Sequence, residues 1–255
     1  MLAGKFGYFR QSFTPRSLAN LALWYDGADT STFTLNGSNV SQWADKSGNN
    51  RHGVQATAAN QPAYGTWSGS LRALDNTDFR AGFLSVSSGL GVTRNIGAFC
   101  VSVAIKNFFD TPGQVYIQSN TSVGNTRFRM AVNETAGAAG ALAVIGRRLD
   151  ANGIAGVASL TSPLAAGSYI VTAVLDYATA TALLYRNGTL LATNASFQTA
   201  GNTSDTDSTG FQVMGLGAYF YGQMGEIAAY TRRPSDAERL RLERYLGARW
   251  GVTVA

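Results

Sequence analysis

The chain has 255 residues, of which 45% are hydrophobic, 11% aromatic and only 14% charged, and it contains 29 glycines. Ordinary domains carry about 25% charged residues, so this composition, rich in Ser, Thr, Asn and Gly, favours strands and turns and excludes a disordered chain. The formal net charge is +5, but the arginines are scattered, and we therefore expect no nucleic-acid partner. No apolar run approaches the roughly 20 residues of a membrane span.

The chain holds one cysteine, Cys100, and one histidine, His52. A single cysteine excludes an internal disulfide and a cysteine-based metal cluster, and a single imidazole limits any catalytic triad or histidine metal site. Cys100 lies in the apolar run 99–105, and we interpret it as a small buried side chain. The first ten residues lack the unbroken apolar core of a secretory signal, so we expect none.

Residues 1–20 differ from the rest of the chain, because they combine basic and aromatic residues with no acid. We predict that this segment is an arm that docks onto a neighbouring subunit. The alternative is that the arm folds back on its own domain. The side chains predicted to make the docking contact are Phe6, Tyr8, Phe9, Arg10 and Phe13.

From residue 21 onward, short apolar or alternating runs are separated by polar turns, which is typical of strands. Asn187-Gly188 is the clearest turn, since both positions of a type I′ hairpin favour positive φ. About a dozen strands predict an all-β domain built as a two-sheet sandwich. The predicted strands lie at 21–25, around 40–43, on both sides of the turn 75–76 within 71–86, and at 98–108, 113–118, 127–132, 141–149, 168–176, 182–186, 189–192, 211–216 and 225–231.

One helix is predicted at the C-terminus, over 235–250. Ser235 and Glu238 have the spacing of a capping box, and Gly251 is placed to end the helix. Leu242 and Leu246 share one face, as an amphipathic helix requires. We expect this helix to close the sandwich.

Six segments of the chain form a combined pattern: 21–26, 40–49, 184–188, 225–230, 234–239 and 245–251. Together they resemble laminin-G-like, concanavalin A-like lectin/glucanase domains of the kind found in phage particle proteins and bacterial surface proteins. The resemblance implies a two-sheet antiparallel jelly-roll sandwich over residues 21–255. This superfamily spans lectins, hydrolases, adhesive domains and virion parts. Independently of the resemblance, Trp24 and Trp43 are large apolar side chains in predicted strands, and we expect them in the core rather than stacked on a ligand.

Catalysis is not expected. The hydrolase signature of the superfamily, Glu-x-Asp-x-Glu, places acids on one face of a strand, and no two glutamates of this chain have that spacing. Glu226 is the best-placed carboxylate, but its strand has no second acid. We predict no catalytic residues.

A calcium ion is the one cofactor that the loops suggest. Their side-chain oxygens could coordinate the ion or could hydrogen-bond the turn backbone, and we favour the turn, with no cofactor. The four side chains concerned are Asp26, Asp45, Ser47 and Asn49.

Five aromatic residues lie beside turn glycines, where an exposed ring could stack on a sugar. The alternative is packing at the edge of the sandwich. The candidates for glycan binding are Tyr64, Trp67, Tyr219 and Tyr221, together with Phe220.

These features favour a non-enzymatic structural or adhesive component of a phage particle: a head decoration, fibre or tail protein located in the virion. Its expected partners are other particle proteins, contacted through the arm, and a cell-surface glycan, and we expect a homo-oligomer. The alternative is a glycan-binding lectin module of a bacterial surface protein, extracellular or at the cell surface. A glycoside hydrolase is the weakest reading.

Overall fold

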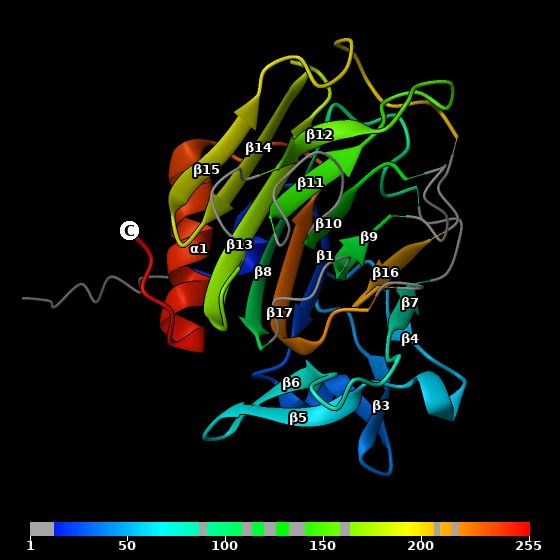
Figure 1. Ribbon diagram of the computed structural model, residues 1–255, viewed down its shortest axis with the longest axis vertical. Helices are drawn as coiled ribbons and strands as arrows, with labels where there is room; N and C mark the ends of the chain where they lie inside the picture. Colours follow the sequence, from blue (N-terminus) through cyan, green and yellow to red (C-terminus); the bar gives the residue numbers. More distant parts are fainter. Residues whose placement is uncertain are drawn as a thin grey trace, which may run out of the picture.

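The computed structural model describes residues 13–86, 91–108, 114–119, 126–132, 141–158, 164–206, 210–215 and 219–255. Over these residues the chain forms seventeen strands, three short 3-10 turns and one α-helix (Figure 1). The strands are β1 (Leu21–Asp26), β2 (Phe33–Asn36), β3 (Asn39–Trp43), β4 (Gly53–Val54), β5 (Ala63–Ser68), β6 (Leu71–Asp75), β7 (Leu84–Val86), β8 (Ala98–Asn107), β9 (Val115–Gln118), β10 (Arg129–Val132), β11 (Leu142–Gly146), β12 (Ala155–Ala158), β13 (Gly167–Asp176), β14 (Thr181–Arg186), β15 (Thr189–Asn194), β16 (Phe211–Val213) and β17 (Gly222–Tyr230), and the helix is α1 (Asp236–Trp250).

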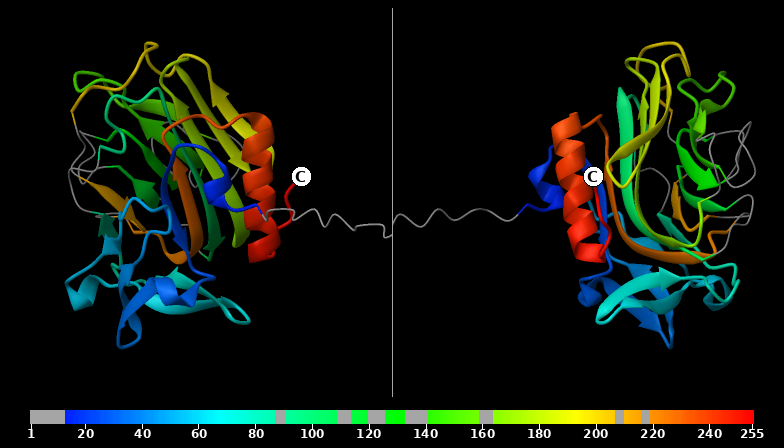
Figure 2. Two further views of the ribbon diagram at one scale, coloured as in Figure 1. Left: turned by 180° about the vertical axis from the view of Figure 1, so that it is seen from behind. Right: turned by 60° about the vertical axis from the view of Figure 1, so that its left-hand side comes forward.

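Strand β8 lies at the centre of the sheet, because it pairs with β13 on one side and with β17 on the other. The ladder continues from β13 through β14 to β15, and from β17 to β1 and β6. Strands β9 to β12 form a second run, which β16 joins to β7. In both views of Figure 2 the two runs face each other as layers.

All the strand pairs are antiparallel, and the short strands β3 to β7 link the two runs into one continuous ladder. The all-β, antiparallel architecture with a C-terminal helix is thus confirmed. The division into the two separate sheets of a jelly roll stays a prediction, since hydrogen bonds join every described strand.

The main core fills the space between the layers. Phe99 from β8 meets the rings of Phe128 and Phe211 edge-on, at 5.0 and 5.7 Å between centroids. A second core lies between β8, β13, β17 and the helix, which includes Cys100 and Trp250. Two cores explain why nearly every residue of β8 is buried, instead of every second one as in a half-exposed strand.

Helix α1 begins and ends as the sequence predicts. The Ser235 hydroxyl accepts from the Glu238 N–H, and the Glu238 carboxylate accepts from the Ser235 N–H at 2.8 Å, which is a capping box. Gly251 ends the helix in the left-handed conformation, with φ 69°. The helix lies along the outer side of the β8–β13 layer, so it closes the second core (Figure 2).

Residues 13–20 belong to the folded domain, which corrects part of the predicted arm. The Tyr230 hydroxyl donates to the Pro15 carbonyl at 3.0 Å, and Leu18 is buried in the second core. Phe13 meets Tyr245 edge-on, at 5.8 Å between ring centroids, and the Arg241 guanidinium lies 4.5 Å from its ring. This is the fold-back alternative for that end of the arm. The other predicted docking residues, Phe6, Tyr8, Phe9 and Arg10, lie outside the described residues.

Strands β2 to β6 form a smaller lobe at one end of the molecule (Figure 1). Trp43 holds this lobe to the main core, because its ring stacks between Tyr25, at 5.1 Å, and Phe33, at 5.2 Å. Trp24 and Trp43 are both buried, as their large apolar side chains in strands predicted. In the part of the chain that the structure describes, no helix is long and apolar enough to cross a membrane.

Candidate functional site

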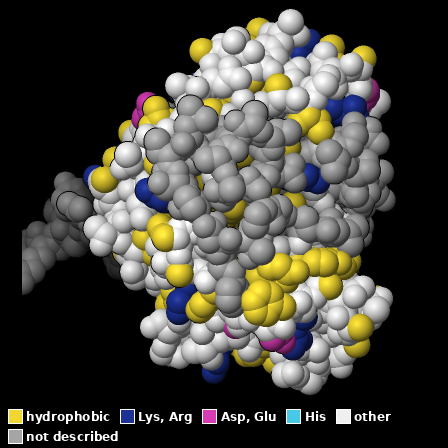
Figure 3. Space-filling model, in the orientation of Figure 1, with side chains coloured by type: hydrophobic (Ala, Val, Ile, Leu, Met, Phe, Trp, Pro, Cys, Tyr) yellow, Lys and Arg dark blue, Asp and Glu magenta, His cyan; other side chains and the backbone are white. Residues whose placement is uncertain are grey.

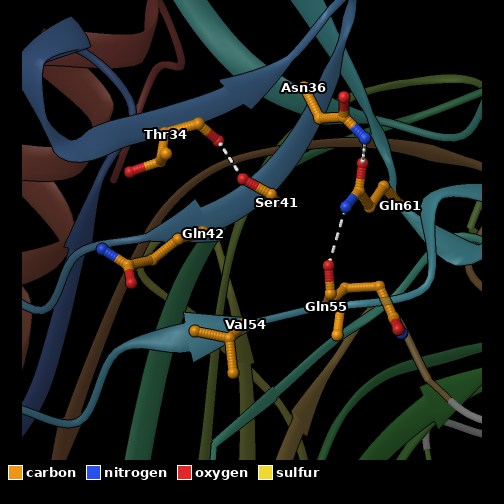
Figure 4. A pocket seen from close by; sticks show the side chains of 8 residues that line it. Thr34, Asn36, Ser41, Gln42, Val54, Gln55 and Gln61 are labelled. Atoms are coloured by element: carbon orange, nitrogen blue, oxygen red, sulfur yellow. Dashed lines mark hydrogen bonds between the residues drawn. The ribbon is translucent and has the colours of Figure 1, made fainter.

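An open pocket, most of whose lining residues are uncharged and polar, lies in the smaller lobe and has a volume of about 420 Å³ (Figure 4). Volumes of roughly 300–1,000 Å³ are typical of small-molecule sites. Its lining comes from the β2–β3 hairpin and from β4 with the segment that follows it. The lining residues are Thr34, Asn36, Ser41, Gln42, Val54, Gln55, Ala56 and Gln61.

One wall of the pocket is fixed by its own hydrogen bonds. The Gln61 amide oxygen accepts from Asn36 Nδ2 at 3.1 Å, and Gln61 Nε2 donates to the Gln55 carbonyl at 2.8 Å. Gln55 and Gln61 are buried, so these amides are held in place before any ligand arrives. Gln55 Oε1 in turn accepts from the Thr57 N–H at 3.0 Å.

The opposite wall keeps hydrogen-bonding capacity unused. In Figure 4, Gln42 and Thr34 lie across the pocket from Asn36, Gln55 and Gln61. The Ser41 hydroxyl donates to the Thr34 carbonyl at 3.0 Å, whereas the Gln42 amide and the Thr34 hydroxyl have no side-chain partner in the described ranges. An amide and a hydroxyl can each donate and accept, which is what the hydroxyl groups of a ligand require.

None of the described residues that line the pocket is charged. These lining residues therefore offer no cationic side chain that could offset the cost of removing water from an anionic ligand. Half-exposed Val54 adds one apolar patch, with 39% of its surface exposed. The chemistry of the pocket suits a neutral, hydroxyl-rich molecule with some apolar surface.

A second surface feature joins two aromatic rings. Phe79, 56% exposed, lies 5.1 Å from Tyr221 between ring centroids, with the ring planes at 50°. In the view of Figure 3, hydrophobic side chains gather near the level of β4 and β7. Phe79 was not among the predicted residues, because a lone Phe in a polar loop carries no sequence signal of exposure.

The predicted glycan-binding aromatics are divided by the fold. Tyr221 lies in the aromatic surface just described, and Tyr219 is half-buried. Tyr64 is also half-buried, and its ring meets Phe33 edge-on at 5.1 Å, with the Arg72 guanidinium 5.4 Å away. These positions leave part of each ring available.

Trp67 corrects the prediction of an exposed ring. It is 5% exposed, packs edge-on against Trp250 at 5.0 Å, and donates its indole N–H to the Trp250 carbonyl at 3.1 Å. Phe220 has no exposed surface and packs against Tyr116. Both residues follow the packing alternative, because an apolar ring at the edge of the sheet is stabilised by burial against α1 or the main core.

The loop oxygens considered for calcium hold the turn together. Asp45 Oδ1 accepts from the N–H groups of Trp24 and Ser47, at 2.9 and 2.8 Å. Asn49 Nδ2 donates to the Leu21 and Ala22 carbonyls, both at 3.0 Å. Among the residues that the structure describes, no group of three or more His, Cys, Asp or Glu could hold a metal ion.

Asp26, the fourth of these candidates, is bound by two cations. Its carboxylate accepts from Lys46 Nζ at 2.8 Å and from Arg249 Nη2 at 2.8 and 2.9 Å. This pairing offsets the cost of burying a carboxylate with no exposed surface.

Glu226 is enclosed on all sides. Trp24 and Trp250 each donate an indole N–H to one of its carboxylate oxygens, at 2.8 Å, and Arg249 Nε lies 3.5 Å away. The burial of this side chain, reinforced by the charge of Asp26, raises its pKa to about 7. With no exposed surface, Glu226 connects β1, β17 and α1 and reaches no ligand.

No protein-family model and no curated protein sequence matches this chain. Solved structures do match it. The binding domain of Paraclostridial Mosquitocidal Protein 1 is 11% identical, with a TM-score of 0.60 over 92% of this chain and 53% of that one. The binding domain of botulinum neurotoxin DC in complex with SialylT is also 11% identical, with a TM-score of 0.58 over 91% and 52%.

A Trypanosoma rangeli sialidase in complex with sialic acid matches as well, at 13% identity and a TM-score of 0.55, over 91% of this chain and 33% of the sialidase. At these identities the likeness shows a shared fold. This chain spans about half the length of the two toxin binding domains. Its β-rich fold is thus one that occurs in binding domains and in an enzyme.

Proposed function

We propose that the chain is a non-enzymatic carbohydrate-binding module whose polar pocket takes a neutral sugar. The observation that carries this proposal is the lining of the pocket. Six of its eight residues offer amide or hydroxyl side chains, none is charged, and two of the six have free hydrogen-bonding groups.

The rigidity of the pocket supports the same function. Polyols bind weakly when a site must first be ordered, because each immobilised side chain costs free energy. Here the Asn36–Gln61–Gln55 hydrogen bonds have already fixed one wall. The strands of the hairpin fix the backbone of the other wall.

The fold of the comparison structures is compatible with this role. One is a toxin binding domain in complex with SialylT, and another is a sialidase in complex with sialic acid. We extend from them only the idea that this fold can present a sugar site. The uncharged pocket leads us to a different ligand class, the neutral sugars. The concanavalin A-like assignment of the sequence fits this proposal.

The test is a glycan array followed by calorimetric titration of the neutral glycans that bind. Gln42→Leu and Thr34→Val together remove the free hydrogen-bonding groups, and we expect the affinity to fall about tenfold. Thr193→Val on the exposed strand β15 is a matched control that should bind as the wild type does. If the double variant kept the wild-type affinity, the pocket would not be the binding site. If no glycan on the array bound the wild type, the proposed carbohydrate-binding function would be wrong.

We further propose that the module is displayed on a phage particle as a homo-oligomer, with the N-terminal segment making the contacts. The acid-free, aromatic and basic composition of this segment supports the hypothesis. Deletion of residues 1–12 leaves the packed residues Phe13, Pro15 and Leu18 in place, so the domain should stay folded. Light scattering should show an oligomer for the full chain and a monomer for the deletion. An identical mass per particle for both would contradict the proposal.

A further inference from the structure

Phe79 has a backbone conformation that is unfavourable for its residue type. Its φ is 62°, in the left-handed region, where a bulky residue without a functional reason is an outlier. The same residue exposes 56% of its surface, although burial of a phenylalanine ring is normally stabilising. Both features lower stability, and such costs gather at binding sites when the surrounding structure enforces them.

The loop around Phe79 is held rigidly. Asn76 is fully buried, and its amide donates to the Gly82 carbonyl at 2.6 Å. The Asn76 N–H donates to the Gly222 carbonyl at 3.0 Å, which ties the loop to β17. The Phe79 N–H in turn donates to the Asn76 carbonyl at 3.1 Å. These bonds leave Phe79 little freedom to turn inward.

An ion pair completes the support from the other side. Arg80 Nε donates to both oxygens of Asp78, at 2.9 and 2.7 Å, and its guanidinium also donates to the Asn39 side chain. Asn39 is the partner of Asn36 across the β2–β3 hairpin, and Asn36 lines the polar pocket. The Phe79 loop is therefore fixed to the same hairpin that forms the pocket.

Tyr221 extends the exposed ring into a surface. Its ring lies 5.1 Å from that of Phe79, and its backbone N–H donates to the Gln114 side chain at 2.9 Å. Residues far apart in the sequence thus place two rings side by side on one face. The Arg80–Asp78 pair and Asn39 border them with polar groups.

We propose that Phe79 and Tyr221 form a stacking surface for a pyranose ring, a second contact that makes the ligand an oligosaccharide. The inference rests on the proposed function. A pyranose presents a flat apolar C–H face and a rim of hydroxyls, and this matches aromatic rings with polar borders. Arg80, next to Phe79 in the chain, bonds to Asn39. Asn36, the partner of Asn39 across the hairpin, lines the pocket. Under this proposal, one short glycan contacts both places.

The size of the surface favours a sugar over a protein partner. A stable protein interface buries about 1,200–2,000 Å² in total, and its centre is a continuous apolar patch. In the described part of the chain, the large hydrophobic side chains that are exposed are only Leu35, Val54, Phe79 and Leu190. Leu190 belongs to β15 in the other part of the molecule, so it adds nothing to the exposed surface of Phe79.

The test compares Phe79→Asn with the wild type in titrations with a monosaccharide and with an oligosaccharide, both chosen from neutral array hits. Asn adopts left-handed φ readily, so the variant should fold. We expect about a tenfold loss of affinity for the oligosaccharide and none for the monosaccharide. Phe79→Tyr should retain the affinity, and Leu190→Asn, which removes an exposed apolar side chain elsewhere, should have no effect.

This inference would be overturned if Phe79→Asn kept the wild-type affinity for the oligosaccharide while the Gln42→Leu, Thr34→Val double variant lost affinity. The proposed function would then still stand. A wild-type protein that binds no glycan would overturn both. An equal loss for the monosaccharide would also contradict the inference, because the ring would then act on the pocket itself.

Discussion

Asp26 and Glu226 face each other across the β1–β17 ladder, and neither carboxylate has any exposed surface. Like charges directly opposite in a sheet are destabilising. The neighbouring groups stabilise the two carboxylates in different ways. Lys46 and Arg249 form ion pairs with Asp26, whereas the indole N–H groups of Trp24 and Trp250 donate hydrogen bonds to Glu226. This arrangement joins β1, β17 and α1.

We predict that Glu226 makes the stability of the protein depend on pH. Its pKa is raised from 4.5 to about 7, so the folded protein binds a proton that the unfolded chain has already released. The free energy of unfolding should therefore fall as the pH rises from about 4.5 to about 7, by up to about 3 kcal/mol. Urea denaturation at a series of pH values measures this change.

Glu226→Gln should remove most of this pH dependence, because an amide does not titrate. Glu238→Gln is the matched control. The salt bridge of Glu238 with Arg232 lowers its pKa from 4.5 to about 2, so its contribution to stability changes mainly between these two pH values, below the window, and its replacement should leave the slope between about 5 and 7 unchanged. A Glu226→Gln protein with the wild-type slope would show that another group is responsible.

Trp67→Ala should unfold the protein at a lower denaturant concentration. The substitution leaves a cavity against Trp250 and removes the bond from the indole N–H to the Trp250 carbonyl. Truncation of a buried aromatic side chain costs about 3–5 kcal/mol. Denaturation with and without a bound glycan separates this loss of stability from an effect on binding. A variant as stable as the wild type would contradict the buried position.

Phe79→Asn should not lower the free energy of unfolding, and we expect a gain of up to about 1 kcal/mol as the backbone strain is relieved. Phe128→Ala provides the contrast, because that ring has no exposed surface and its loss should cost about 3–5 kcal/mol. Chemical denaturation of both variants measures whether the free energy of unfolding rises or falls in each. Similar destabilisation in both would mean that Phe79 contributes to the core.

The fold was predictable where its cause is local. The Asn187-Gly188 turn has positive φ at both residues, 51° and 88°, between β14 and β15, and the capping box of α1 is formed as predicted. Cys100 is buried, and the burial raises the pKa of its thiol to about 12. In each case a few neighbouring residues are sufficient to determine the conformation.

Strands β2, β4, β5 and β12 were missed, because their sequences show neither a clear alternation nor an apolar run. β2 has one half-buried residue followed by three exposed ones, and its pairing with β3 holds it as a strand. The pocket depends on this pairing and on the packing of residues 55–61 beside it. No sequence period reveals such a contact.

Of the two residues of the aromatic surface, Tyr221 was predicted from the sequence and Phe79 was not. Tyr221 was a candidate because it lies between turn residues, but the position of Phe79 is set by bonds to Gly222 and Asn39, which are distant in the sequence. The prediction that Trp67 is exposed was wrong for the opposite reason. Its sequence neighbourhood is a turn, whereas α1 covers it from the other end of the chain.

The central claim is that the uncharged pocket of the smaller lobe binds a neutral sugar. Its most direct test is calorimetric titration of the wild type and of the Gln42→Leu, Thr34→Val double variant with a neutral glycan and with its sialylated form. We predict saturable binding of the neutral glycan and about a tenfold loss in the variant. Binding that requires the sialic acid, or that the double substitution leaves unchanged, would contradict the claim.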